Sequence, residues 1–334
     1  MAQDQPDPHV DGKLAFINGA MLKALVPMTD AIELVSRAMI DLSNGGAIAP
    51  ERWAMALTGE DKLGIMPGAM PERGVFGVKL ISLFKGEARP SHQGLMMLFD
   101  LASGAPAAVL DGAVLTGLRT AAASAAATRA LALPGANAVA LLGCGEQAAW
   151  HVEAMLAVRP ITEFHLWSRT PASAESLADD IRSRPGVSVS VHANARDAAQ
   201  ASQIVCTLSA SKEPILEGDW LKSGQHVNLV GSSTRLFREI DERGVARGYY
   251  VADERAHALS QAGEFRRAVE TCEVAESHLQ GEIGEILAGR RPGRTDETMV
   301  TIYKSLGHSV QDLAVAKAAL TRGRERGAIL EFAW

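Results

Sequence analysis

The sequence lacks the features that mark several classes of protein. Its 334 residues include only three cysteines, Cys144, Cys206 and Cys272, which lie far apart and show no CxxC spacing. Isolated cysteines in odd number indicate reduced thiols inside a cell and argue against a disulfide framework. The longest apolar tract, about 120–134, is rich in alanine and interrupted by Arg129, so it predicts a packed helix and not a membrane span.

An excess of basic charge is also missing. The formal net charge is -6, which leaves no positive field to attract nucleic acid or anionic lipid, and we expect neither as a partner. Residues 1–13 are polar and acidic and lack the apolar stretch of a signal peptide. We therefore expect an N-terminal tail on a cytoplasmic protein.

Several catalytic patterns are absent as well. The sequence has no HExxH motif, Cys/His cluster or paired carboxylate array, so no metal is expected. It has no GxSxG motif that would place a nucleophilic serine. The composition is 47% hydrophobic and 22% charged residues, with 31 glycines, which is typical of a globular enzyme. The chain is long enough for about two domains.

The first part of the chain predicts helices followed by a meandering sheet. Apolar residues within 13–45 follow helical spacing. The apolar runs 74–84, 94–101 and 106–110 are separated by polar and glycine-containing segments, which predicts strands joined by turns. A long helix rich in small residues is expected to follow from about Thr116.

The middle of the chain alternates strands and helices. The apolar run 137–143 predicts a buried strand that leads into a glycine-rich turn and a helix. Further strand candidates recur at 164–168, 187–192, 203–209, 226–231 and 249–253. This alternation is typical of a parallel doubly wound sheet. A further helix is expected from about Leu306, so that the C-terminus completes the first domain.

The glycine-rich turn matches a dinucleotide-binding fingerprint. Gly143-Cys144-Gly145-Glu146-Gln147-Ala148 has the GxGxxG/A spacing, after a strand and at the start of a helix. Glycines allow a tight turn, and the helix N-terminus offers N–H groups and partial positive charge to a pyrophosphate. The alternative is a tight structural turn that binds no ligand.

The end of the second strand of this domain indicates which dinucleotide is bound. An NAD-selective site usually has an acid there, to accept a hydrogen bond from the ribose 2′-OH. Ser168, Arg169 and Thr170 stand at this place instead. A guanidinium and two hydroxyls suit a 2′-phosphate, so we expect NADP(H) in preference to NAD(H), which stays possible. A solvated surface arginine is the alternative.

Candidate substrate residues come from the first part of the chain. Lys79 lies in an apolar run, and burial would lower its pKa toward neutrality, as a general acid–base group at an imine requires. The alternative is an outward-facing lysine on the polar side of a strand. Arg52 and Arg119 could bind a carboxylate or form surface ion pairs. His92 and His308 could be catalytic or structural.

Several stretches together resemble the ornithine cyclodeaminase/mu-crystallin family. They are GVKLISLF with SHQGLMMLFD, LDGAVLTGLRTAAASAAATR, LLGCGEQA, IVCTLSASKEPIL, HVNLVGSS and IYKSLGHSVQDLA. The resemblance extends from about Arg52 to Ala314. It implies an α/β fold, with a Rossmann doubly wound parallel sheet over 131–307 and a discontinuous α+β substrate and dimerisation domain over 1–130 and 308–334.

The resemblance also assigns roles. It implies an active site in the cleft between the domains and a homodimer formed through the sheet of the first domain. Arg52 and Arg119 match carboxylate-binding residues, Lys79 matches the residue beside the amine or imine, and His92 lies near the substrate. The implied cofactor contacts are Thr120, Gly143, Gly145, Glu146, Gln147, Ser168, Arg169, Thr170, Thr207, Leu208, Ser209, Asn228, Val230, Gly231, Ser305 and His308.

One position departs from the cyclodeaminases and alanine dehydrogenases of this family. In those enzymes, the resemblance implies an Asp two residues after the glycine of the VNxxG segment. This chain has Ser233 at that position. A serine cannot act as a carboxylate base. In having serine there, the chain looks similar to the mu-crystallin branch, which the resemblance associates with NADPH-dependent reduction of ketimines.

These features predict an NAD(P)H-dependent reductase of small α-imino acids, such as pyrroline-2-carboxylate or piperideine-2-carboxylate, with Lys79 as acid/base. The alternatives are an amino-acid cyclodeaminase or dehydratase with bound NAD, an amino-acid dehydrogenase similar to alanine dehydrogenase, and a non-catalytic NADP(H)-binding protein.

Overall fold

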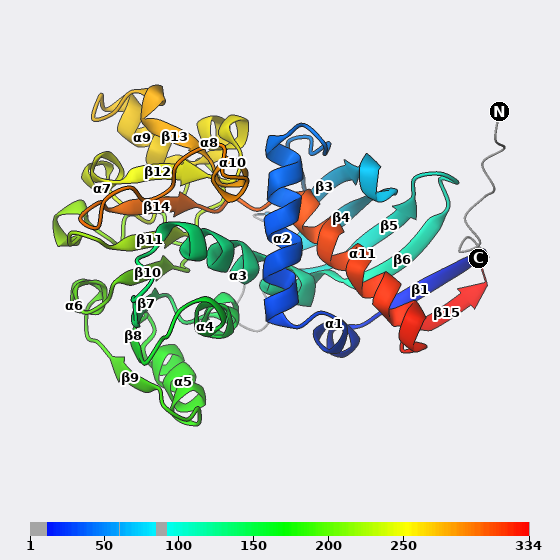
Figure 1. Ribbon diagram of the computed structural model, residues 1–334, viewed down its shortest axis with the longest axis horizontal. Helices are drawn as coiled ribbons and strands as arrows, with labels where there is room; N and C mark the ends of the chain where they lie inside the picture. Colours follow the sequence, from blue (N-terminus) through cyan, green and yellow to red (C-terminus); the bar gives the residue numbers. More distant parts are fainter. Residues whose placement is uncertain (1–11, 60, 85–91, 334) are drawn as a thin grey trace. The chain divides into compact units, whose positions relative to one another are not determined.

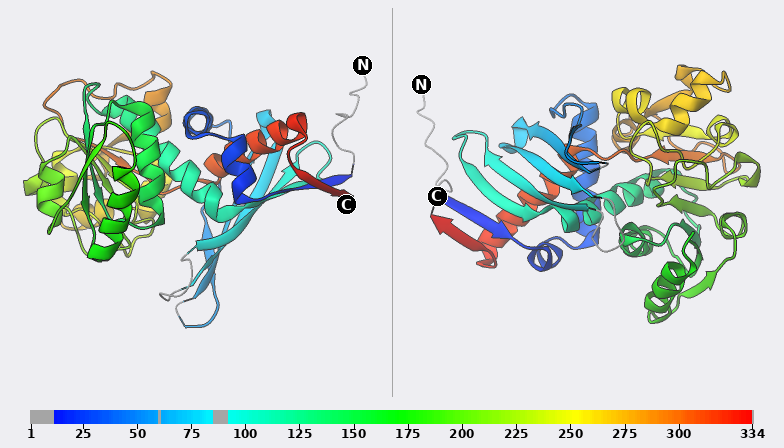
Figure 2. Two further views of the ribbon diagram at one scale, coloured as in Figure 1. Left: turned by 90° about the horizontal axis from the view of Figure 1, so that it is seen from below. Right: turned by 180° about the vertical axis from the view of Figure 1, so that it is seen from behind.

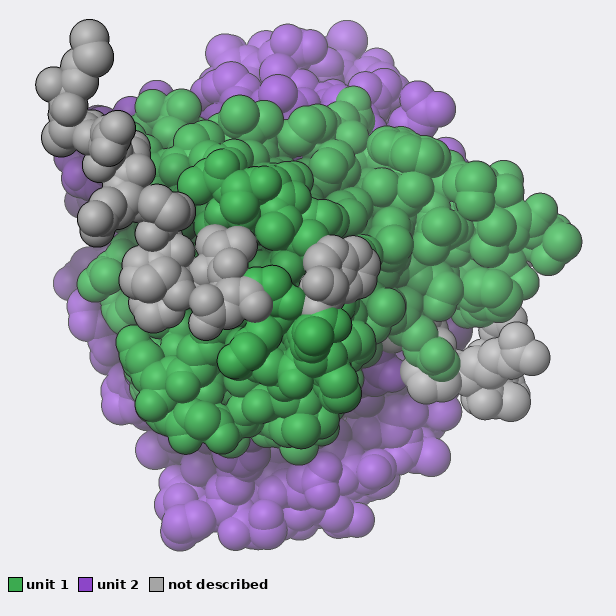
Figure 3. All heavy atoms as spheres, turned by 90° about the vertical axis from the view of Figure 1, so that its right-hand side faces the viewer, with its two compact units in different colours: residues 1–119, 308–334 green, residues 120–307 purple. Residues whose placement is uncertain are grey.

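The computed structural model describes residues 12–59, 61–84 and 92–333. The chain forms two compact units, which Figure 3 colours separately: Met1–Arg119 with His308–Trp334, and Thr120–Gly307. The first boundary between units falls inside one long helix. The tail expected at the N-terminus lies outside the described residues, and the substrate and dinucleotide roles of the two units stay predictions.

The first unit contains a mixed seven-stranded sheet in the order β15-β1-β6-β5-β4-β3-β2 (Figure 1). β1 is antiparallel to β15 and parallel to β6, and the remaining neighbours are antiparallel. The strands are β1 (Lys13–Ile17), β2 (Trp53–Ala56), β3 (Lys62–Met70), β4 (Val75–Leu83), β5 (His92–Asp100), β6 (Pro106–Asp111) and β15 (Leu330–Ala333).

Helices α1 (Gly19–Leu25), α2 (Met28–Ser43) and α11 (Ser309–Arg326) lie on one face of this sheet (Figure 2, left). α2 forms because Ile32, Val35 and Met39 recur at helical spacing, and all three are buried. The helical prediction over 13–45 is wrong at its start, where Lys13–Ile17 is strand β1, and the helical part is divided into α1 and α2 at Val26 and Pro27.

The second unit contains an eight-stranded sheet in which every neighbouring pair is parallel. Its order is β13-β12-β14-β11-β10-β7-β8-β9. The strands are β7 (Ala138–Leu142), β8 (Glu163–Trp167), β9 (Ser188–Val191), β10 (Ile204–Thr207), β11 (His226–Leu229), β12 (Tyr249–Ala252), β13 (Leu279–Glu282) and β14 (Thr301–Lys304).

The predicted Rossmann fold is confirmed by this topology. The chain leaves β7 in one direction to form β8 and β9, and in the other to form β10 and β11, so the strand order reverses beside β7. Ligands of such sheets bind at the carboxyl ends of the strands, at this reversal. β13 and β14 were not expected from the sequence, although β14 is completely buried between β11 and β12.

The helices of the second unit complete its alternating pattern. They are α4 (Glu146–Val158), α5 (Pro171–Arg182), α6 (Ala195–Gln200), α7 (Glu242–Arg247), α8 (Arg255–Gln261), α9 (Gly263–Glu270) and α10 (Ile283–Leu287). The long helix α3 (Gly112–Leu131) contains the boundary between the units. No helix in the described parts of the chain is both long and apolar enough to cross a membrane.

Candidate active site

Lys79 lies on the inner face of β4, in the first unit. Residues on this strand alternate in burial, and Lys79 shares the buried side with Val75, Gly77 and Ile81. Its side chain is 0% exposed. The alternative of an outward-facing lysine is therefore excluded.

The ammonium group of Lys79 contacts a carboxylate on α11. Its Nζ lies 2.8 Å from both oxygens of Asp312 and 3.2 Å from Thr116 Oγ1. The pKa of Lys79 is lowered to about 7, chiefly by burial and next by the charge of Arg119, whereas Asp312 opposes the shift. A lysine with this pKa exchanges a proton at neutral pH, as a general acid–base group must.

Arg119 shares the same carboxylate. Its Nε lies 3.2 Å from Asp312 Oδ1, and its Nη1 donates to Gln311 Oε1 at 3.0 Å. Arg119 is 5% exposed, so it is not a surface ion-pair residue. Asp312 and Gln311 were not among the predicted site residues, although both belong to the KSLGHSVQD stretch that suggested the family.

The remaining predicted substrate residues also lie in the first unit. Arg52 is half-buried just before β2, and its charge helps to lower the pKa of Lys79. His92 is the first residue of β5, but its side chain lies outside the described part of the structure. The basic residues at this site outnumber the single acid, Asp312; they are Arg52, Lys79 and Arg119. Excess basic charge suits an anionic substrate.

The glycine turn of the second unit lies between β7 and α4, as the sequence predicts. Gly143 has a φ of +108°, and a Cβ there would lie 2.7 Å from the carbonyl oxygen of Leu208, so no other residue fits. Gly145 is the N-cap of α4, and a Cβ on it would meet nothing within 4 Å. Open space beside the first turn of a helix fits a pyrophosphate.

Two predicted cofactor residues have buried polar atoms without a protein partner. Within the described residues, Gln147 Oε1 accepts no hydrogen bond, and Ser305 Oγ neither donates nor accepts one. Ser305 is 2% exposed and directly follows β14. Buried polar groups are normally paired, so these atoms fit a site whose partner is a ligand. The residues present therefore fit a dinucleotide.

Ser168, Arg169 and Thr170 follow β8 at the carboxyl edge of the sheet. Arg169 and Thr170 are exposed, and Thr170 is the N-cap of α5. The backbone N–H of Thr170 donates to Ser168 Oγ at 3.3 Å. No acid stands among these three residues.

The other predicted cofactor residues of the second unit follow β10 and β11. Thr207 ends β10, and Leu208 and Ser209 continue from it. Asn228 lies within β11, but its amide Nδ2 donates to Thr128 Oγ1 at 2.9 Å, so its side chain is held in the core. Thr120 is buried on α3, and the segment after β11 contains Val230 and Gly231.

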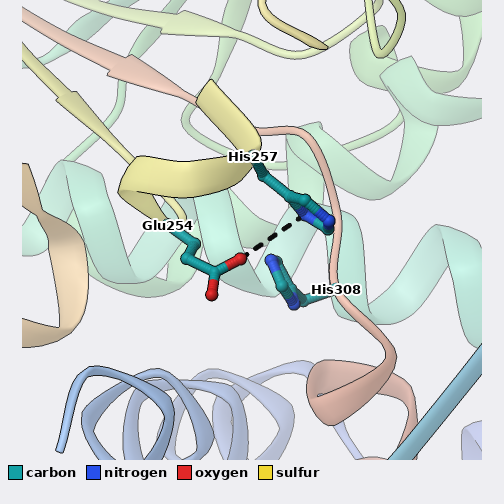
Figure 4. Close-up of side chains that lie close together, drawn as sticks. All are labelled: Glu254, His257 and His308. Atoms are coloured by element: carbon teal, nitrogen blue, oxygen red, sulfur yellow. Dashed lines mark ion pairs between the residues drawn. The ribbon is translucent and has the colours of Figure 1, made fainter. Parts of the chain in front are cut away.

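His308 belongs to the first unit, where it is the buried N-cap of α11. In the second unit, a histidine lies beside an acid at the start of α8. His257 Nδ1 lies 3.7 Å from Glu254 Oε2 (Figure 4).

A buried serine–histidine contact in the second unit was missed by the sequence analysis. His151 on α4 lies 2.9 Å through Nε2 from Ser124 Oγ on α3, and 2.8 Å through Nδ1 from the carbonyl of Gln147. Burial lowers the pKa of His151 to about 4, so the ring is neutral at pH 7. The contact holds α4 against α3. A single histidine in a helical sequence does not indicate such a contact, so the sequence could not have predicted it.

Comparison with known proteins identifies the family. The model of the ornithine cyclodeaminase/mu-crystallin family matches residues 17–326. The chain belongs to this family. Among its relatives, ketimine reductase mu-crystallin of Mus musculus is 33% identical over 82% of this chain and 85% of its own length.

Two further relatives of the family match nearly the whole chain. Delta(1)-pyrroline-2-carboxylate reductase of Bacillus cereus is 31% identical over 91% of this chain and 95% of its own. The solved structure of Thermococcus litoralis Delta(1)-pyrroline-2-carboxylate reductase, in complex with NADH and L-proline, has a TM-score of 0.91. It is 29% identical and covers 95% of this chain and 99% of its own.

Proposed function

We propose that this protein is an NAD(P)H-dependent reductase that converts small α-imino acids, such as pyrroline-2-carboxylate or piperideine-2-carboxylate, to the amino acid. The observation that carries the proposal is the buried Lys79, with a pKa of about 7, between Arg119 and Asp312. Relatives similar over most of the chain are named as reductases of ketimines and of pyrroline-2-carboxylate, which supports the substrate class.

The residues of the first unit bind the imine and supply its proton. Arg52 and Arg119 bind the substrate carboxylate. Two guanidinium nitrogens of Arg119 are fixed by Asp312 and Gln311, which orients the group and leaves Nη2 to donate to the carboxylate.

Lys79 donates a proton to the imine nitrogen as the C=N bond is reduced to C–N. Positive charge on that nitrogen makes the carbon a better hydride acceptor. Asp312 raises the pKa of Lys79 and so favours its protonated form in spite of the burial. Bound NAD(P)H supplies the hydride. The imine carbon gains the hydride and the nitrogen gains the proton, so the product is the amino acid.

The second unit would hold the cofactor. Gly143, Gly145, Glu146 and Gln147 would bind its phosphates, and the residues after β10, β11 and β14 would hold the rest of it. We propose that NADP(H) is preferred, because exposed Arg169 and its neighbours offer donors where an NAD-selective site would have an acid. NAD(H) is the alternative.

We also propose a homodimer formed through the sheet of the first unit. On the face opposite α11, directly paired residues form an apolar row across four strands: Trp53, Ile65, Leu80 and Leu95. Trp53 is 55% exposed and Leu95 is 49% exposed. Because large exposed apolar patches mark interaction sites, a second copy of this chain is the expected cover.

The test of the reductase proposal is a direct assay. Purified protein is mixed with NADPH or NADH and each cyclic imino acid, and the loss of nicotinamide absorbance is followed. We expect oxidation that depends on the imino acid. Release of ammonia from an amino acid without a net change in the nicotinamide would favour a lyase instead. Cofactor binding without turnover of any imino acid would favour a binding protein.

A further inference from the structure

Glu239 is a buried carboxylate of the second unit that has no role in the proposed reaction. It lies between β11 and α7 and is 0% exposed. Burying a carboxylate is costly unless hydrogen bonds compensate for the lost water. The hydrogen bonds of Glu239 therefore indicate its role.

Glu239 accepts hydrogen bonds from two separate segments. One is the end of β10 with the loop that follows it, and the other is the loop after β11. Oε1 accepts from the backbone N and the Oγ of Ser209, at 2.7 and 2.8 Å. Oε2 accepts from Thr207 Oγ1 at 2.8 Å and from the backbone N of Gly231 and of Ser232, at 2.7 and 3.2 Å. One carboxylate therefore joins the loop after β10 to the loop after β11.

These two loops are closely packed where Glu239 joins them. A Cβ on Gly231 would collide with the backbone of Ser209 and would lie 2.6 Å from Glu239 Oε1, so no side chain fits between the loops. The loops leave the carboxyl ends of two adjacent parallel strands, next to the strand-order reversal where Rossmann ligands bind.

We propose that Glu239 is a positioning residue for the cofactor, which holds the loops 207–209 and 230–232 at the spacing that nicotinamide binding requires. The inference rests on the proposed function, because it assumes that these loops contact the cofactor. Glu239 acts through the backbone of the loops and touches no reacting atom. Its role is to fix their geometry before the cofactor arrives.

The hydrogen-bond inventory explains why a carboxylate is needed. The five groups that hydrogen-bond to Glu239 are all N–H or O–H donors, and an ionised carboxylate accepts at both oxygens. Burial raises the pKa of Glu239, whereas the charge of Lys304 and the hydrogen bonds from Ser209 and Thr207 oppose that shift. An amide of the same shape would place an NH₂ group against at least one backbone N–H.

The test is Glu239→Gln, with dissociation constants for NADPH and NADH measured by fluorescence titration. We expect the cofactor Kd to rise by at least about tenfold, because loops that have lost their link must be ordered on binding. The KM for the imino acid at saturating cofactor should stay within about twofold of the wild-type value, because its binding residues are unaffected.

The matched control is Asp241→Asn, two positions further along the chain. Asp241 Oδ1 also accepts from two backbone N–H groups, those of Gly218 and Gly244, at 2.7 and 2.8 Å. Neither belongs to the two loops. We expect Asp241→Asn to lower the melting temperature and to leave the cofactor Kd unchanged.

The outcomes separate this inference from the proposed function. Wild-type protein that binds neither nicotinamide cofactor would overturn both. Wild-type binding with an equal Kd in folded Glu239→Gln would overturn the positioning role alone, as would an equal rise in Asp241→Asn. If Glu239→Gln does not fold, Glu239→Asp carries the test, because its shorter side chain cannot reach both loops. A folded Glu239→Asp with wild-type Kd would then overturn the inference.

Discussion

Lys79 and Asp312 are 233 positions apart in the chain, and their side chains form an ion pair in which Nζ lies 2.8 Å from each carboxylate oxygen. Both side chains are 0% exposed. A buried ion pair is weak evidence for stability, because desolvation of the two charges can exceed their attraction. Its position beside Arg119 is better explained by function. Burial brings the pKa of this amine to about 7, and Asp312 opposes a larger shift.

Replacing Lys79 should abolish most of the activity. We expect Lys79→Met to lower kcat for an imino acid by roughly 10²–10⁴-fold, the usual contribution of a general acid–base group. Cofactor Kd should be unchanged, because the glycine turn and the residues after β8 that are proposed to bind the cofactor lie in the other unit. Breaking a buried pair costs roughly 3–5 kcal/mol, so circular dichroism must show that the variant is folded. Unchanged turnover in folded Lys79→Met would exclude Lys79 as the proton donor.

The reaction should depend on pH through Lys79. A pKa of about 7 means that the amine carries its proton below that pH and loses it above. Reduction needs the protonated form, so kcat/KM should fall as the pH rises through about 7. The measurement is the pH profile of kcat/KM at saturating cofactor.

Asp312→Asn should move this profile in a known direction. Asp312 raises the pKa of Lys79 through its charge and its hydrogen bond, so its removal lowers that pKa. The falling limb should therefore shift to lower pH than in the wild type. Titration of the free substrate is the same for both enzymes, so a difference between the two profiles belongs to the protein. Coinciding limbs would show that Asp312 does not control Lys79.

Arg169 should set the preference between cofactors. If its guanidinium binds a 2′-phosphate, Arg169→Ala raises the Kd of NADPH about tenfold, which equals about 1.4 kcal/mol, and leaves that of NADH nearly unchanged. Arg182→Ala is the control, because Arg182 is a surface arginine on α5 that pairs with Asp179 and Glu175. Equal losses for both cofactors would indicate that Arg169 does not read the 2′-position.

Leu95→Glu should disrupt the proposed dimer. Leu95 ends the apolar row on the open face of the first sheet and is 49% exposed, and a charge buried against a second copy is strongly unfavourable. Light scattering after size exclusion should give the dimer mass for the wild type and the monomer mass for the variant. Leu236→Glu, at a leucine of the second unit that is 70% exposed, should remain dimeric. A wild-type monomer would contradict the proposal.

Local pattern was enough for the Rossmann part of the fold. The strand β7, the turn with Gly143 and Gly145 and the helix α4 are consecutive in the chain, so spacing and residue type identify them together. The same reasoning failed for Lys13–Ile17, because this strand is defined by its pairing with β15 and β6, both far away in sequence. Five residues with several apolar side chains do not distinguish a strand from a helix.

The sequence by itself determined the alternation of strands and helices in the second unit and the glycine turn after β7, because each depends on neighbouring residues. Lys79 became the candidate acid–base group through the family resemblance, since the local pattern alone also allowed an outward-facing lysine. Only the tertiary structure decided that Lys79 is buried, that Asp312 is its partner and that Glu239 links two loops. These contacts join residues brought together by sheet pairing and helix packing. No spacing along the chain encodes which buried charges will meet.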